Sequence, residues 1–273
     1  MRPSVIASMP EVTICLLTYG DNAHLAGRAI DSIRAFCPRS EYELMVGANA
    51  VSDATRARLE TLKAAGAVDH LLDSPVNLSK CPMMRRMFGK VNTKYIWWFD
   101  DDSHITAPDA WSRWLVPARA APDSTVMWGQ VYRCNSPSDF TDLENVAAFI
   151  RSASWYRGLP PPSWHPGGRG EFNFNGSNRG DGRWDFIVGG CWLIRTATVR
   201  ALDWPDPRLG RLGDDVFLGE AIRQHGWQMV HLSEPGVAIN TAPRRGPWGR
   251  TLLHFPNEPS GGESALDPPG PPA

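Results

Sequence analysis

Three consecutive carboxylates, Asp100 to Asp102, follow the most aromatic apolar run of the chain, Tyr95-Ile-Trp-Trp-Phe99. Like charges repel one another, so such a cluster at the end of a buried strand needs a counter-charge or a structural role. The structural alternative is an acidic turn that caps a helix beginning at Pro108. The chemical alternative is a bound cation, because two carboxylates in a tight turn can both reach one ion.

A second acidic pair, Asp214 and Asp215, opens the segment DDVFLGEAIRQHG, in which Val216, Phe217 and Ala221 share one face of a predicted helix. The N-terminal end of a helix carries a partial positive charge, which stabilises ionised carboxylates there. These two acids therefore either cap the helix or provide a charged group suited to proton transfer.

The composition of the chain excludes several classes of function. The 273 residues include 28 basic and 29 acidic side chains, and a net charge of −1 gives no field that would attract nucleic acid or a membrane surface. The five cysteines form no CxxC pair, which favours free thiols in a reducing compartment and argues against a zinc site. The start of the chain does not form a signal peptide, and no apolar run approaches the ~18 residues of a membrane helix. We therefore expect a cytoplasmic protein.

Strands and helices alternate along the first hundred residues, which predicts a parallel α/β sheet covered by helices. Apolar runs place the strands at residues 12–17, 42–47, 68–72 and 94–99. In such a sheet, ligands bind beyond the carboxyl ends of the strands. The polar segments TYGDN, GANAVSD and DDDSH each follow a strand, so the sequence predicts that they meet in one crevice.

The second half of the chain is less regular. Helices are predicted near residues 108–120, 142–156 and 214–226, and strands at 125–132, 185–195, 227–232 and 236–239. Residues 157–183 are rich in Pro, Gly and Asn, and a loop of this length is expected to be functional or mobile. We expect a short N-terminal extension over residues 1–10, one domain over 11–256, and a disordered Pro/Gly-rich tail over 257–273.

In type and order, these motifs resemble those of the GT-A glycosyltransferases of the family-2 type. The similarity spans about residues 11–240 and includes TYGDN, GANAVSD, FDDDSH, GGCWLIR and GDDVFLGEAIRQHGW. It implies a single Rossmann-like α/β domain with a mostly parallel central sheet. Residues 11–106 would form the nucleotide-sugar-binding half, and residues 107–256, including the loop 157–183, the acceptor-binding half. The resemblance also implies an enzyme that transfers a sugar with inversion, from a nucleoside-diphosphate sugar to an acceptor hydroxyl, by metal-assisted single displacement.

The resemblance assigns the acidic turn to the donor and to a metal. In the family this is the DxD motif, where Mn²⁺ or Mg²⁺ neutralises the phosphate oxygens as the glycosidic bond breaks. Asp102 is expected to be the direct metal ligand, with Asp100 nearer the ribose or a metal-bound water and Asp101 completing the donor-binding turn. A further ligand is expected after the last strand, where His254 is preferred and Asn240 and His231 are the alternatives.

The resemblance places the nucleobase beside the segment that follows the first strand. There, Thr18 can form hydrogen bonds, Tyr19 can stack on the base, and Gly20 completes the turn. The strand-end acid that usually holds uracil is replaced by Asn49, whose amide offers both a donor and an acceptor. The resemblance therefore favours a UDP-linked sugar, while the replacement leaves the identity of the base open.

Basic side chains follow on the segment 79–90, which lies near the base and phosphates in the family. Arg85 or Arg86 could hold the donor phosphate, Arg85 being preferred, and Lys80 lies on the same segment. The alternative for these residues is a solvated surface charge.

The resemblance assigns catalysis to the second acidic pair. Asp215 corresponds to the base that deprotonates the acceptor hydroxyl, and Asp214 to its orienting partner. On the acceptor side, Gly190 allows the backbone to approach a sugar closely. Trp192 either stacks on the acceptor or belongs to the core.

Two other classes of function were compared with this interpretation. One is a sugar-nucleotide or glycan-binding module without catalysis, which Asn49 and Asn240 support and the intact acid pairs oppose. The other is a metal-dependent phosphohydrolase or nucleotidyltransferase, for which the sequence offers no further acid cluster. The expected partners are a nucleotide sugar and a carbohydrate or other hydroxyl-bearing acceptor, with no strong sign of nucleic acid or membrane. A glycan, a peptide, a lipid-linked sugar and a modified nucleic-acid base remain alternatives for the acceptor.

Overall fold

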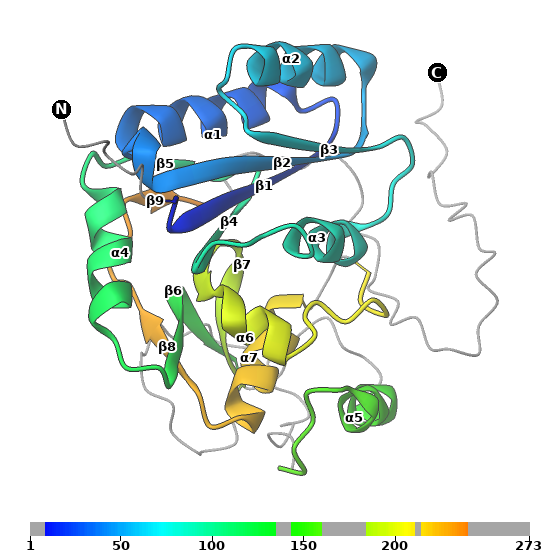
Figure 1. The fold of residues 1–273 in the computed structure, drawn as a ribbon. Coiled ribbons are helices and arrows are strands. Elements are labelled where there is room, and N and C mark those ends of the chain that lie inside the picture. The colour runs from blue at the N-terminus through cyan, green and yellow to red at the C-terminus, as the bar shows by residue number, and fades with distance from the viewer. Residues whose placement is uncertain (1–8, 135–142, 160–183, 211–213, 240–273) are drawn as a thin grey trace, which may run out of the picture.

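The computed structural model of the chain describes residues 9–134, 143–159, 184–210 and 214–239 (Figure 1). The strands are β1 (Val12–Gly20), β2 (Tyr42–Val51), β3 (His70–Ser74), β4 (Tyr95–Asp100), β5 (His104–Ile105), β6 (Thr125–Cys134), β7 (Trp184–Arg195), β8 (Gln228–His231) and β9 (Val237–Ala238). The helices are α1 (Ala23–Phe36), α2 (Asp53–Ala64), α3 (Lys80–Phe88), α4 (Ala110–Ala120), α5 (Leu143–Ser152), α6 (Thr196–Ala201) and α7 (Asp214–Gln224), with a 3₁₀ turn at Arg39–Glu41. The predicted tail, most of the N-terminal extension and nearly all of the loop 157–183 lie outside the described residues.

Seven of these strands form one sheet in the order β3-β2-β1-β4-β7-β6-β8, and β5 pairs with β9 separately. The first four strands of this order are parallel to one another, and β6 is parallel to β8. β7 lies between β4 and β6 and runs antiparallel to both. The predicted α/β fold with a mostly parallel central sheet is therefore confirmed, with one reversed strand that the sequence did not indicate.

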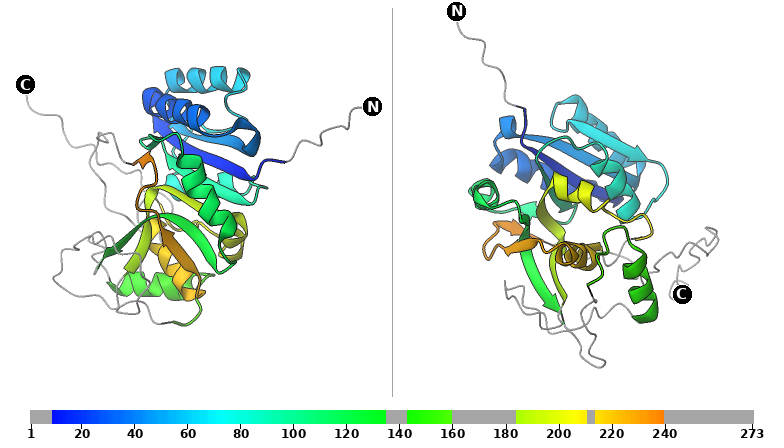
Figure 2. Two further views of the ribbon diagram at one scale, coloured as in Figure 1. Left: turned by 90° about the vertical axis from the view of Figure 1, so that its left-hand side faces the viewer. Right: turned by 60° about the horizontal axis from the view of Figure 1, so that its bottom comes forward.

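Both faces of the central sheet are buried beneath helices, as the views in Figure 2 show. Successive side chains of a strand point to opposite faces, so a strand covered on both sides must be apolar throughout. On β4, Tyr95, Trp97 and Phe99 pack with α1 and α4, whereas Ile96 and Trp98 pack with α3, α6 and α7. This double burial explains the continuous aromatic run that precedes the acidic cluster.

The helix boundaries follow the local signals in most places. Ser52 caps α2, since its hydroxyl accepts a hydrogen bond of 3.2 Å from the backbone N–H of Thr55, as is typical of serine at a helix start. α4 begins at Ala110 rather than at Pro108, because Asp109 takes the cap position. This difference shortens the predicted helix at its start and leaves its buried face unchanged.

Close backbone contact places α7 directly on β7. A Cβ atom added to Gly219 would lie 2.3 Å from the carbonyl oxygen of Asp185, a distance that no side chain tolerates. Only glycine therefore allows the helix to approach the strand this closely. The same contact brings the first residues of α7 beside the Gly189–Gly190 part of β7.

The described cysteines Cys15, Cys37, Cys81 and Cys191 are free and buried, in agreement with the prediction of free thiols. Burial raises the pKa of each of these thiols, so the thiolate form is disfavoured. Among the helices in the described part of the chain, none has the length and apolar character needed to cross a bilayer.

Candidate active site

The carboxyl ends of β1, β2 and β4 lie side by side at one edge of the sheet. β1 is the central member of the three and pairs with both neighbours in parallel. Its register places Tyr19 opposite Asn49 on β2 and Leu17 opposite Asp100 on β4. The predicted convergence of TYGDN, GANAVSD and DDDSH is therefore observed for the strand ends from which these segments start.

The acidic turn after β4 is folded inward. Asp100, Asp101 and Asp102 are 7%, 2% and 1% exposed. Asp101 accepts a hydrogen bond of 2.8 Å from the hydroxyl of Thr18, and Asp100 accepts one of 3.1 Å from the indole N–H of Trp98. The turn closes through a 2.9 Å hydrogen bond from the N–H of Ser103 to the carbonyl of Asp100. Asp100 and Asp101 thus accept hydrogen bonds from side chains of the strands β4 and β1.

The chemistry of this turn fits a hard divalent cation. Mg²⁺ is usually bound in proteins by one or two carboxylates together with phosphate oxygens and water, and the turn supplies several carboxylates at a ligand-binding edge. In the described residues, no three His, Cys, Asp or Glu side chains form a metal site by themselves. His231 uses Nδ1 to accept a 3.0 Å hydrogen bond from the N–H of Val131, whereas Asn240 and His254 lie outside the described residues.

The second acidic pair begins α7, as predicted. Asp215 accepts a hydrogen bond of 3.1 Å from the N–H of Gly189 on β7 and one of 2.9 Å from the N–H of Val216. Asp214 is buried, and Asp215 is half-buried at the same helix end. A Cβ atom at Gly189 would lie 3.4 Å from a carboxylate oxygen of Asp215 and 3.1 Å from the ammonium of Lys80. Glycine at this position keeps the strand close to both groups.

The two carboxyls of this pair are difficult to ionise together. Burial raises the pKa of Asp215 to about 7, and the neighbouring Asp214 adds to the rise, while Lys80 and two backbone N–H groups oppose it. Burial also raises the pKa of Asp214, and Lys80 opposes that rise. A carboxyl whose pKa lies near neutrality is well suited to accept a proton during catalysis.

Lys80 joins the two acidic motifs. Its ammonium lies 3.3 Å from Asp100 and 3.2 Å from Asp214, and it donates a 3.2 Å hydrogen bond to the carbonyl of Gly189. Burial opposes its charge, but Asp100, Asp214 and Asp215 outweigh that effect and raise the pKa of Lys80. The sequence placed Lys80 on a basic segment and gave it no role of its own.

The amide of Asn49 is engaged inside the protein. Its nitrogen donates hydrogen bonds to the side-chain oxygen of Asn77 at 3.0 Å and to the carbonyl of Ser79 at 3.2 Å. Its oxygen accepts a 2.8 Å hydrogen bond from the N–H of Leu78. Asn49 is 3% exposed, so it organises the segment before α3 and does not face outward as a base-reading side chain would.

Among the other predicted donor contacts, Tyr19 and Arg85 differ in their surroundings. Tyr19 is 39% exposed at the end of β1, where a ring is free to stack on a base. The guanidinium of Arg85 binds the carbonyls of Asp203 and Pro205 at 2.8 and 2.9 Å and pairs with the Asp203 carboxylate at 2.6 Å. Arg85 therefore fastens α3 to the segment after α6 in this structure.

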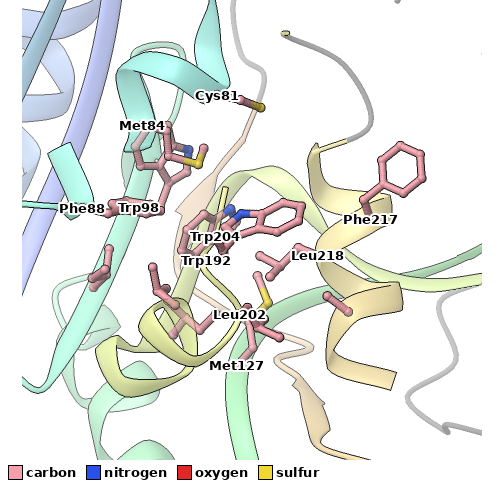
Figure 3. Close-up of a cluster of buried hydrophobic side chains, with 14 of the residues drawn as sticks. Cys81, Met84, Phe88, Trp98, Met127, Trp192, Leu202, Trp204, Phe217 and Leu218 are labelled. Atoms are coloured by element: carbon pink, nitrogen blue, oxygen red, sulfur yellow. The ribbon is translucent and has the colours of Figure 1, made fainter. Parts of the chain in front are cut away.

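The predicted acceptor residues lie on the reversed strand β7. Gly190 is buried beside Gly189. Trp192 is 1% exposed and stacks on Trp98 with ring centroids 5.8 Å apart, with the edge of Phe88 against it (Figure 3). Of the two alternatives for Trp192, the structure supports a core residue, because its ring is covered on both sides.

With this arrangement described, the sequence was compared with known proteins. Residues 10–255 match the family described as Glycosyltransferase like family 2. The chain belongs to this family. The match covers most of the chain, including both acidic motifs and Lys80, and it agrees with the resemblance noted from the sequence. A comparison with curated proteins found no match.

Solved structures similar to this family-2 chain share its fold at low identity. A mannosyltransferase, PcManGT from Pyrobaculum calidifontis in complex with GDP-Man and Mn²⁺, has 17% identity and a TM-score of 0.53, over 88% of this chain and 59% of that one. Residues 1–349 of TarS from S. aureus have 12% identity and a TM-score of 0.50, over 82% of this chain and 58% of that one. The chain thus spans less than two thirds of either neighbour, and these likenesses identify the GT-A fold.

Proposed function

We propose that this protein is an inverting glycosyltransferase that moves a sugar from a nucleoside-diphosphate sugar to an acceptor hydroxyl. The observation that carries this proposal is the single cluster formed by the two acidic motifs, in which Lys80 lies 3.3 Å from Asp100 and 3.2 Å from Asp214. The acidic turn after β4 is suited to the donor phosphates, and the acidic pair that begins α7 is suited to proton transfer. Bringing both together at a ligand-binding edge is what a direct displacement requires.

On the donor side, the edge of the sheet would hold the nucleotide between Tyr19 and the acidic turn. Tyr19 is exposed enough to stack on a base, and the backbone at Gly20 adopts a positive φ of 60° that turns the chain away from the strand end. Asp102 and Asp100 would hold a divalent cation there, with Asp101 fixed by Thr18 as the support of the turn. When bound, the cation supplies positive charge to the diphosphate leaving group.

On the acceptor side, Asp215 would act as the base. Its carboxyl takes the proton from the acceptor hydroxyl as that oxygen bonds to the anomeric carbon and the bond from this carbon to the diphosphate oxygen breaks. The N–H of Gly189 holds one oxygen of Asp215 in place, and the N–H of Val216 holds the other. Asp214, paired with Lys80, would keep its charge beside this base and orient it.

The decisive experiment measures binding and turnover of nucleotide sugars. A UDP-linked sugar is the first donor to test, and GDP-mannose is the second, because the PcManGT structure contains GDP-Man with Mn²⁺. At a donor concentration 100 times Kd, binding adds about 2.7 kcal/mol to stability, which raises Tm by roughly 5–10 °C. We expect that rise only when Mn²⁺ or Mg²⁺ is present, together with slow hydrolysis of the donor.

Two outcomes separate the alternatives. A donor that binds with metal but is neither hydrolysed nor transferred would favour a binding module without catalysis. If no nucleotide sugar raises Tm with either metal, the proposed function is wrong.

A further inference from the structure

Lys80 is the first residue of α3, and its surroundings are unusual for a lysine side chain. The side chain is 13% exposed, and its ammonium contacts Asp100 of β4, Asp214 of α7 and the carbonyl of Gly189 on β7. It also lies 5.8 Å from the ring centre of Trp98. Lysine is rarely buried unless it is paired, and here three elements supply the partners. This is a built site for a cation, made from the parts of the chain assigned to the donor and to the base.

The segment before α3 is shaped to hold Lys80 in this place. Ser79 adopts a positive φ of 67°, which a residue with a side chain seldom takes. The Asn49 amide binds the carbonyl of Ser79 and the N–H of Leu78 on either side of that bend. The N–H of Cys81 donates a 2.9 Å hydrogen bond to the carbonyl of Gly210. The backbone on both sides of Lys80 is thus fixed, which places its Cα where the ammonium can reach all three partners.

A divalent cation at the acidic turn would share a carboxylate with this ammonium. The ammonium of Lys80 donates a hydrogen bond to Oδ2 of Asp100, and the other oxygen of that carboxylate accepts a hydrogen bond from the indole N–H of Trp98. Two cations that use the same carboxylate repel each other strongly inside a protein, where the effective dielectric is low. Lys80 and the metal therefore compete for Asp100, while Asp214 remains available to Lys80.

We propose that Lys80 is an internal counter-cation that holds Asp100 and Asp214 together before the donor arrives and releases Asp100 to the divalent cation when the donor binds. This inference rests on the proposed function. It makes Lys80 a positioning residue, since it acts through Asp100 and Asp214. It also predicts a property that a purely structural lysine would not have, namely that removing its charge strengthens metal binding.

The test compares Lys80→Met with the parent protein and with Lys90→Met, a matched change at an exposed lysine just after the same helix. Binding of Mn²⁺ alone is measured by calorimetry or by the loss of the free-ion EPR signal. We expect Lys80→Met to bind Mn²⁺ roughly tenfold more tightly or better, because a competing unit charge is gone. Lys90→Met should bind Mn²⁺ as the parent does.

Thermal denaturation gives a second readout. Removing one partner of a buried ion pair leaves the others uncompensated, so Lys80→Met should lower Tm by roughly 10 °C in metal-free buffer. Mn²⁺ should restore much of this loss, whereas NaCl at matched ionic strength should not. A lysine that only supports the fold would lower Tm with no recovery in Mn²⁺.

Equal or weaker Mn²⁺ binding by Lys80→Met, including no detectable binding by either protein, overturns the proposal. If Lys80→Met does not fold, the double variant Lys80→Met/Asp214→Asn removes both charges of the pair and should recover a cooperative unfolding transition. Mn²⁺ binding is then compared between the double variant and Asp214→Asn. These measurements need no nucleotide, so the failure of this inference is distinct from a failure of the parent protein to bind or turn over a nucleotide sugar.

Discussion

Replacing Asp215 by Asn separates catalysis from folding at this site. The change keeps the size of the side chain, and the amide oxygen can still accept the hydrogen bond from the N–H of Gly189 that Asp215 accepts at 3.1 Å. What is lost is the ability to take a proton, together with the second hydrogen bond, because the amide nitrogen of Asn cannot accept from the N–H of Val216. Transfer to the acceptor should therefore fall by the ~10²-fold or more that general-base catalysis typically supplies. Donor affinity should change little, because the base acts on the acceptor.

The same change should alter the stability of the protein in a pH-dependent way. The pKa of Asp215 is about 7, because burial and Asp214 both oppose its ionisation, whereas an unfolded Asp has a pKa of ~3.9. As pH rises from ~4 to 7, the unfolded chain releases this proton and the folded protein keeps it, so ionisation increasingly opposes folding and does so fully above pH 7. The full difference corresponds to at most ~4 kcal/mol, since each pKa unit is ~1.4 kcal/mol. Partial exposure of Asp215 reduces this to roughly 1–3 kcal/mol.

The assay combines both readouts. The Tm of Asp215→Asn relative to the parent protein should rise by roughly 3–10 °C between pH 4 and pH 8, and the missing hydrogen bond lowers it by an amount that does not depend on pH. The parental transfer rate should itself rise with pH up to about 7, as the base becomes ionised. Glu60→Gln is the matched control, because it converts an exposed carboxyl on α2 to an amide. Near-parental transfer by Asp215→Asn would move the base elsewhere, with Asp214 the next candidate. A difference in Tm between variant and parent that stays the same from pH 4 to pH 8 would refute the assigned burial penalty.

Two further changes test the donor side. Asp102→Ala should abolish most of the Mn²⁺-dependent affinity for the nucleoside diphosphate, measured by calorimetry, while the far-UV spectrum stays unchanged; undiminished affinity would remove Asp102 from the metal site. Asn49→Asp should destabilise the protein by about 1–3 kcal/mol in thermal or urea denaturation, because a carboxylate cannot donate to the buried oxygens of Asn77 and Ser79. If that variant keeps full stability and binds UDP more tightly, the side chain at position 49 contacts the nucleobase and the structural role assigned to Asn49 is wrong.

The strands of the first half could be predicted because each one carries its own evidence. β1 and β4 are buried on both faces, and that burial requires the continuous apolar runs that the sequence displays. The direction of β7 could not be predicted in the same way. The apolar sequence of β7 predicts a buried strand in either orientation. Its direction depends on the path of the chain between β6 and β7, much of which lies outside the described residues. A local pattern therefore identifies a strand but not the way it runs.

The positions of site residues could be predicted when they follow from the end of a single strand. They could not be predicted when they depend on contacts among several helices and strands. The acidic turn follows directly from the end of β4, so its place at the sheet edge was expected. Arg85 was assigned to a phosphate, but its guanidinium reaches Asp203 and Pro205, more than a hundred residues away in sequence. Lys80 was given no role because its burial requires partners from β4, β7 and α7 at once. Such long-range pairing leaves no periodic signal in the sequence.

The charge balance of the cluster connects these findings. Among the described residues, Lys80 lies beside three carboxyls, those of Asp100, Asp214 and Asp215, and the pKa of Asp215 is raised first by burial and then by the neighbouring Asp214. A bound diphosphate would add further negative charge at the same edge, which Lys80 alone would not neutralise. A divalent cation on the acidic turn would correct that imbalance, and it would leave Lys80 with Asp214 beside the base. On this argument, the metal and Lys80 divide the acids between the leaving group and the nucleophile, so binding of the donor prepares the site for transfer.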